Sequence, residues 1–335
     1  MTLLRSCGIL AVMVLIGASG AAAQSQAEVL RLEGDVSPIH DPTMIREGDT
    51  FHVFATNRFQ GKHTPQFCST DLRQWKFCGN VFDGVPRWAL NWVPGAQGMW
   101  APDASYVNGE YRLYYSISTF GSTQSVIGLT TNKTLNPESP DYEWKDQGFV
   151  VGSSHWNDWN AIDPNFAVDE NGDHWLSWGS FWSGIKMRKL DKATGKLSSE
   201  DTTMYSLANR RPAQPPAIEA PVVVRHGGSY YLFVSIDRCC RGADSTYKIV
   251  VGRSDKITGP YTDRNGKPMT EGGGTLVLDG SEAWRGPGGQ HVLLGDPKGD
   301  LLIFHSYNAE TGRPFLQVST LTWDEAGWPG AGRLP

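Results

Sequence analysis

The sequence has few charged residues and almost no long apolar stretches. Only 19% of its 335 residues are charged, and the formal net charge is −5. This mild acidity argues against binding to nucleic acids or anionic membranes, because both attract basic protein surfaces. Beyond an N-terminal run at 9–16, no stretch approaches the roughly 18 apolar residues of a membrane-spanning helix. We therefore expect a soluble protein with neither nucleic acid nor a membrane as partner.

Several catalytic signatures are also missing. The sequence contains neither the G-x-S-x-G motif of serine esterases nor the H-E-x-x-H motif of zinc proteases, which argues against both enzyme classes. No cysteine or histidine pairs have the spacing of a structural zinc site. No stretch shows a convincing helical period of apolar residues, and little helix is expected.

The N-terminus has the pattern of a secretory signal peptide. Arg5 is the positive residue, the apolar run at 9–16 follows, and Ala21 and Ala23 form a small-residue cleavage site. We predict a signal peptide over 1–23, cleaved after Ala23, and a secreted or periplasmic mature chain.

Four cysteines follow the predicted cleavage site. Cys68 and Cys78 flank a predicted hairpin, FCSTDLRQWKFC, and we expect a disulfide across it, because export permits disulfides; two buried thiols are the alternative. The adjacent Cys239 and Cys240 form either a vicinal disulfide or a pair of free thiols.

The strongest pattern is an internal repeat. Five segments share a proline, a strand-forming run, a polar or glycine turn and an aromatic-rich second strand. Their prolines, roughly 60 residues apart, are Pro42, Pro102, Pro164, Pro221 and Pro287. This period accommodates four short strands with their connections, as in a propeller blade. We predict an all-β fold, a single five-bladed β-propeller over 24–335. A two-sheet sandwich would not explain five near-equal units.

Each unit also contains a turn between two strand-like runs. The predicted hairpin turns lie at 46–49, 108–109, 170–173, 227–228 and 297–300. Runs at 127–131 and 249–254 fit third strands of the second and fourth blades.

Three acids occupy nearly the same place in the repeat. Asp41 and Asp163 directly precede the prolines of the first and third units, and Glu219 lies two positions before Pro221. Innermost strands line the channel of a propeller, so these positions converge. Like charges in a partly desolvated pocket raise the pKa of at least one of the acids. Such a cluster destabilises the fold and is therefore expected only where catalysis needs it. An Asp-Pro pair alone is ordinary turn chemistry, but this register favours the acid and base of glycosidic cleavage.

At these residues the chain resembles glycoside hydrolase family 43 and, within it, the arabinanases. The resemblance spans essentially the whole predicted mature chain. The matching stretches are HDP at 40–42, MWAPD at 99–103, WNAIDPN at 159–165, WGSFWSGI at 178–185 and EAP at 219–221.

The resemblance implies a role for each acid. Asp41 is expected to be the general base, Glu219 the general acid, and Asp163 the residue that orients the acid and adjusts its pKa. It further implies endo-hydrolysis of α-1,5-linked arabinan with inversion, by a chain that we expect to be monomeric. The alternatives are an exo-acting arabinanase, an arabinofuranosidase or β-xylosidase, or a carbohydrate-binding propeller without activity. A lectin would not need all three positions to be acidic.

Other residues are expected to contact substrate or a metal. Aromatic rings stack on sugars, and polar groups beside the acids contact substrate in the family. The candidates are Trp100, Phe120, Gly121, Asn160, Trp178, Ser180 and Phe181. The resemblance implies a channel cation, usually Ca²⁺, held by His291 and waters; a neutral histidine bonded to the channel wall is the alternative. His40, which precedes the predicted base, is expected to orient it.

Overall fold

The fold is known from a computed structural model that describes residues 27–56, 63–213 and 215–335. The predicted signal peptide lies outside the described residues. Within them, no helix has the length and apolar character that crossing a membrane requires.

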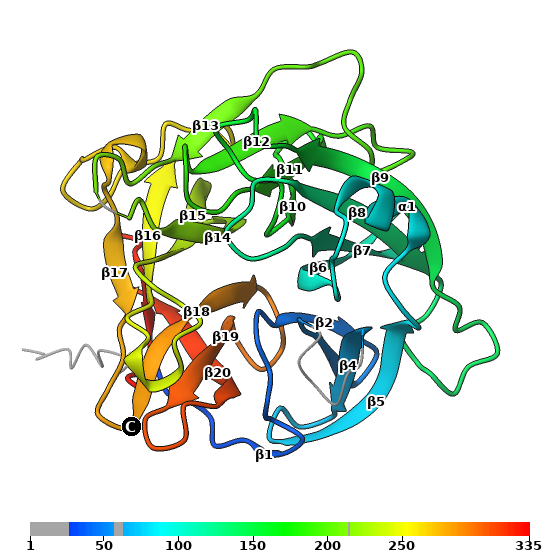
Figure 1. Cartoon of the computed structure of the whole chain (residues 1–335). Coiled ribbons are helices and arrows are strands. Elements are labelled where there is room, and N and C mark those ends of the chain that lie inside the picture. The colour runs from blue at the N-terminus through cyan, green and yellow to red at the C-terminus, as the bar shows by residue number, and fades with distance from the viewer. Residues whose placement is uncertain (1–26, 57–62, 214) are drawn as a thin grey trace, which may run out of the picture.

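Five β-sheets surround a central axis (Figure 1). The first contains β1 (Glu33–Gly34), β2 (Thr43–Glu47), β3 (Thr50–Phe54), β4 (His63–Ser69) and β5 (Gln74–Phe82). The second contains β6 (Trp100–Val107), β7 (Glu110–Ile117), β8 (Ser125–Asn132) and β9 (Lys145–Ser153). The third contains β10 (Asn165–Val168), β11 (His174–Trp178), β12 (Ile185–Lys189) and β13 (Tyr205–Ala208). The fourth contains β14 (Ile218–His226), β15 (Ser229–Ile236), β16 (Lys248–Ser254) and β17 (Thr275–Leu278). The fifth contains β18 (Trp284–Leu293), β19 (Leu301–Asn308), β20 (Pro314–Trp323) and β21 (Pro329–Ala331).

These sheets are the blades of a closed propeller. Four strands of each blade pair antiparallel in chain order, and β1 adds a parallel edge strand beside β5. The innermost strands β2, β6, β10, β14 and β18 contact one another in a ring around the axis (Figure 1). The predicted five-bladed propeller is therefore confirmed, and the sandwich alternative is wrong.

The repeat also placed the turns correctly. All five predicted turns lie between the first two antiparallel strands of a blade, and the two predicted third strands lie within β8 and β16. Helix is scarce, as expected: the described residues form α1 (Arg87–Trp92) and the short 3₁₀ turns η1 (Gly242–Asp244) and η2 (Met269–Glu271).

The core lies between blades, because alternate residues of a strand point to opposite faces. In β16, Ile249 and Val251 belong to the cluster that includes Leu302 of the fifth blade. Val250 between them belongs to the cluster that includes Met187 of the third blade. Each blade therefore buries both of its faces against neighbours. The segment before β1 joins the last blade, where the Leu30 N–H donates to the Val318 carbonyl at 2.8 Å.

The backbone before each repeat proline is left-handed. The φ angle is 50° at Asp41, 39° at Ala101, 58° at Asp163, 52° at Ala220 and 55° at Gly286. Residues other than glycine seldom adopt this region, and such conformations cluster at functional sites. In β6, β14 and β18 the pairing register also shifts here, as in a β-bulge that re-aims a side chain. The repeat is thus visible in the backbone that carries the acids.

Both cysteine pairs form disulfides. Cys68 and Cys78 are bonded across the β4–β5 hairpin, with Cα atoms 5.9 Å apart, as predicted. Cys239 and Cys240 are bonded to each other, so the vicinal disulfide is the correct alternative.

Candidate active site

A cavity of about 410 Å³ lies where several innermost strands begin. It is lined by all three predicted acids and by six predicted substrate residues. These nine residues are Asp41, Trp100, Phe120, Gly121, Asn160, Asp163, Ser180, Phe181 and Glu219. Ring closure therefore brings together side chains from the first four blades, as the repeat register predicts.

Asp41 is held by two side chains and presents an ionised carboxylate. The His40 Nδ1 lies 2.7 Å from Oδ2, and the Thr56 hydroxyl donates to the same oxygen at 2.7 Å. Burial by itself would raise the pKa of Asp41. The charge and hydrogen bond of His40, with smaller contributions from His305 and Thr56, outweigh burial and lower it. Asp41 thus has the ionisation state that a general base requires.

His40 has the orienting position expected for it. Nδ1 donates to the Asp41 carboxylate, and the Tyr307 hydroxyl lies 2.6 Å from Nε2 on the other side of the ring. The His40 ring is also stacked on His305, with centroids 3.7 Å apart. These contacts fix the plane of the imidazole that supports Asp41.

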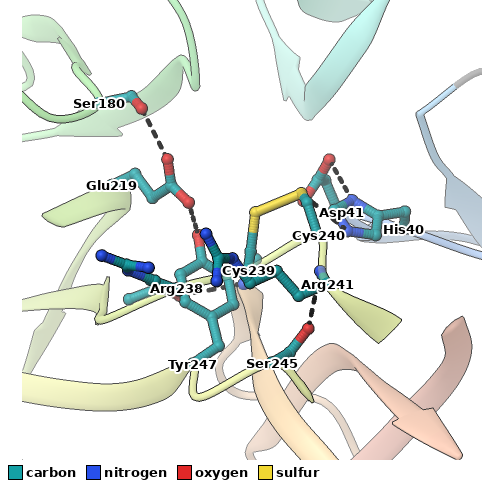
Figure 2. The surroundings of a disulfide bond; sticks show 12 residues. His40, Asp41, Ser180, Glu219, Arg238, Cys239, Cys240, Arg241, Ser245 and Tyr247 are labelled. Carbon is teal, nitrogen blue, oxygen red and sulfur yellow. Dashed lines mark hydrogen bonds and ion pairs between the residues drawn. A yellow bond between two sulfur atoms is a disulfide. The ribbon is translucent and has the colours of Figure 1, made fainter. Parts of the chain in front are cut away.

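Glu219 is buried, with 8% of its surface exposed, and two hydroxyls hold it. Ser180 donates to Oε2 at 2.6 Å, and Tyr247 donates to Oε1 at 2.5 Å (Figure 2). Ser180 was predicted as a substrate contact. Its hydroxyl is engaged with Glu219, which gives it a direct part in placing this acid.

Asp163 is hydrogen-bonded to the blades on either side of its own. Its backbone N–H donates to the Ser116 hydroxyl at 3.0 Å. Its Oδ2 accepts the backbone N–H of Ala220, the residue after Glu219, also at 3.0 Å. Asp163 is thereby tied to the chain segment that carries Glu219.

The pKa values of Asp163 and Glu219 are shifted opposite to that of Asp41. Burial raises the pKa of Asp163 well above its usual value, and the charges of Glu219 and Asp41 add to this. Burial also raises the pKa of Glu219, although the Ser180 and Tyr247 hydroxyls oppose the shift. The pair retains a proton at pH values where an isolated carboxyl has lost it. The cavity therefore contains a proton donor and an ionised acceptor, the combination that general acid–base chemistry needs.

An aromatic surface forms one wall of the cavity. Trp100 and Phe120 lie with ring centroids 5.4 Å apart, and 75% of the Phe120 surface is exposed. Trp178 is a correction to the prediction, because its side chain is fully buried in the core and is absent from the cavity lining. It is the last residue of β11, and its ring packs against Trp159. Proximity to the motif in sequence did not reveal the direction of this side chain.

Sequence reasoning missed several residues that support the acids. Thr56, Tyr247, His305 and Tyr307 all contact Asp41, His40 or Glu219. His305 and Tyr307 lie two apart on β19, so strand alternation could have placed them on one face. Tyr247 precedes β16 and has no local signal. The cavity wall also contains Cys239 and Cys240, whose position no motif indicated.

His291 does not line the large cavity, but it lies in a small adjoining cavity of about 30 Å³ that Asp41 and Asp163 also line. Its Nε2 is 3.9 Å from Oδ1 of Asp103, and burial lowers its pKa to about 4. It is therefore neutral near pH 7, and its Nε2 faces the carboxyl group of Asp103, whose own pKa burial raises to about 7. The Met44 N–H lies 3.5 Å from the other ring nitrogen, Nδ1. A hydrated divalent cation in this cavity would be held by the imidazole and by waters.

Comparison with known proteins identifies close relatives. The model of the glycosyl hydrolases family 43 matches residues 37–329. An extracellular endo-α-(1→5)-L-arabinanase of Bacillus subtilis is 44% identical over 87% of this chain and 87% of its own length. An extracellular exo-α-(1→5)-L-arabinofuranosidase of Cellvibrio japonicus is 42% identical over 87% of this chain and 85% of its own. The solved structure of a family 43 endo-arabinanase from Bacillus licheniformis superimposes with a TM-score of 0.82 at 44% identity, covering 90% of this chain and 99% of that one.

Proposed function

The chain belongs to the glycosyl hydrolases family 43, and from this premise we propose that it is a secreted endo-α-1,5-L-arabinanase that inverts the anomeric centre. The observation that carries the proposal is the opposite shift of pKa values in one cavity. Asp41 remains ionised, whereas the Asp163 and Glu219 pair holds a proton. Inverting cleavage requires one carboxylate and one carboxylic acid on opposite sides of the bond.

In the proposed mechanism, Asp41 removes a proton from a water molecule as the water oxygen attacks the anomeric carbon. The bond from that carbon to the leaving oxygen breaks, and Glu219 donates its proton to this oxygen. Asp163 takes no part in the proton transfer. Its contact with the Ala220 N–H holds the Glu219 segment, and repulsion between the two carboxyl groups keeps one proton on the pair.

Two observations support arabinan as substrate and endo action as the mode of cleavage. The relatives in Bacillus subtilis and Cellvibrio japonicus are both named for α-(1→5)-linked L-arabinose chemistry, and the Bacillus subtilis protein is named as endo-acting. The exo name of the Cellvibrio japonicus relative makes release of single sugars the second candidate.

Purified protein should be incubated with linear arabinan, debranched arabinan, xylan and galactan. We expect short oligosaccharides from linear arabinan and, by proton NMR at early times, products of inverted anomeric configuration. Monomer as the sole product would establish exo action instead. Absence of cleavage of every polymer would exclude the hydrolase proposal.

We also propose that His291 and waters hold a Ca²⁺ ion in the channel, in the small cavity that Asp41 and Asp163 also line. A bound cation would supply positive charge that offsets repulsion among the carboxylates. Dialysis against a chelator should lower the melting temperature, and Ca²⁺ should restore it. Elemental analysis of the untreated protein that finds no divalent metal would contradict this proposal.

Export is proposed from the N-terminal pattern and from the extracellular names of both relatives. N-terminal sequencing of the mature protein should begin at Gln24. A mature protein that still carries residues 1–23 would contradict it.

A further inference from the structure

We propose that the vicinal disulfide Cys239–Cys240 positions the general base Asp41, through Tyr307 and His40. Figure 2 shows this disulfide beside His40 and Asp41, with Glu219 and Tyr247 nearby. Both cysteines line the cavity. The inference rests on the hydrolase function proposed above, which supplies the role of Asp41.

A continuous series of hydrogen bonds joins the disulfide to Asp41. The backbone N–H of Cys240 donates to the Tyr307 hydroxyl oxygen at 3.0 Å. That hydroxyl lies 2.6 Å from Nε2 of His40, and Nδ1 of His40 lies 2.7 Å from Asp41. The Sγ of Cys240 is also 3.8 Å from Nε2 of His40, so the sulfur borders the same imidazole.

Every link of this series joins two polar groups at hydrogen-bond distance. The ionised Asp41 accepts from Nδ1 of His40, and Nε2 of the same ring shares a hydrogen bond with the Tyr307 hydroxyl. The Tyr307 oxygen also accepts the N–H of Cys240. Each group in the series is held by the next one, so a shift of Cys240 would remove one of the contacts that hold Tyr307.

The disulfide explains why Cys240 stays in place. The φ angle of Cys240 is 65°, a left-handed conformation that a residue with a Cβ seldom adopts. A bond between adjacent side chains closes a small ring through the backbone and removes most alternative conformations of the dipeptide. Without it, the backbone at Cys240 would be free to relax and to turn its N–H away from Tyr307.

The rest of the loop is anchored independently. The N–H of Thr246 donates to the Arg238 carbonyl at 2.9 Å, and the N–H of Arg241 donates to the Ser245 hydroxyl at 3.0 Å. Tyr247, which holds Glu219, is 2% exposed and adjoins β16. Opening the disulfide should therefore disturb the base while leaving the acid in place.

The second disulfide provides a matched control. Cys68 and Cys78 join β4 to β5 in the outer half of the first blade, and neither residue lines the active-site cavity. Their loss affects stability alone if the proposal is correct.

The test compares two double variants on linear arabinan. In Cys239→Ala/Cys240→Ala we expect kcat to fall by about tenfold, as for a slightly misplaced base, with KM within about twofold. The acidic limb of the pH profile should move to higher pH, because Asp41 loses support from His40 while His305, Asp163 and Glu219 still face it. The Cys68→Ala/Cys78→Ala control should show a lower melting temperature and an unchanged pH profile.

Chemical reduction gives the same test without mutating the loop. The Cys68→Ala/Cys78→Ala protein retains Cys239–Cys240 as its disulfide, so a phosphine reductant should reproduce the loss of kcat, and reoxidation should reverse it. An unchanged kcat and acidic limb after confirmed reduction would overturn the proposal. The proposal would also be overturned if kcat and oligosaccharide binding fell together while the acidic limb of the pH profile stayed in place. That result would show that the disulfide has only a general structural role. Inactive wild-type protein would instead refute the hydrolase function itself.

Discussion

The backbone N–H of Ala220 donates a hydrogen bond to Oδ2 of Asp163 at 3.0 Å. This contact joins the third blade to the residue directly after Glu219. It places the carboxyl group of Asp163 beside Glu219, and one oxygen of Asp163 holds the strand that carries Glu219.

The Asp163→Asn variant separates these two roles. An amide oxygen still accepts the Ala220 N–H, but the second carboxyl of the coupled pair is lost, so Glu219 no longer titrates against a like charge and its pKa should fall. The acid must be protonated to act, and the alkaline limb of kcat/KM should therefore move to lower pH. A pH profile from about pH 4 to 10 checks this. An alkaline limb at its wild-type position would contradict the charge effect.

Ser180→Ala should move the same limb in the opposite direction. The Ser180 hydroxyl stabilises the ionised form of Glu219, and its removal should raise the pKa of this acid further. Glu219 then keeps its proton to higher pH, and the alkaline limb moves up. If the alkaline limb moved in the same direction in Asp163→Asn and in Ser180→Ala, it would reflect the titration of a group other than Glu219.

Glu219→Gln should remove the proton donor. We expect kcat on arabinan to fall by about 10²- to 10⁴-fold, the usual contribution of a general acid. An aryl arabinofuranoside with an acidic phenol needs little protonation, so its hydrolysis should fall far less. Glu310→Gln, an exposed position on the β19–β20 turn, is the control and should behave as wild type. Equal losses on both substrates would assign Glu219 another role.

Phe120→Ala should weaken substrate binding. The ring is exposed at the cavity and lies beside Trp100, so its loss should raise KM for arabinan about fivefold, with kcat nearly unchanged. Tyr106→Ala is the matched control, because Tyr106 is 58% exposed but does not line the cavity. Similar KM values for the two variants would exclude Phe120 as a sugar platform.

Ile249→Ala should destabilise the propeller by about 2 to 5 kcal/mol, since the side chain is fully buried between the fourth and fifth blades. Leu276→Ala on neighbouring β17, where 56% of the residue is exposed, should change stability by about 0.5 kcal/mol or less. Urea unfolding of both variants checks the difference. A comparable loss in Leu276→Ala would show that burial does not determine the effect.

The sequence alone determined the architecture and the convergence of the three acids. Both follow from a local pattern, because a repeat of roughly 60 residues with one proline per unit specifies equivalent strands, and equivalent strands of a closed ring face one axis. The Cys68–Cys78 bond could also be predicted from the sequence, since the two cysteines lie across one hairpin. The roles of the acids came from family resemblance, and they remain predictions.

Tertiary structure alone decided what surrounds those acids. His40 and Tyr307 are 267 positions apart, and Glu219 reaches Ser180 and Tyr247 in different segments. Trp178 turned into the core although its neighbours line the cavity, and Cys239–Cys240 turned toward the base. Closing the ring sets these distances, and the pKa values follow from the burial and charges that closure creates. No local pattern carries that information, because the partners meet only when all five blades are in place.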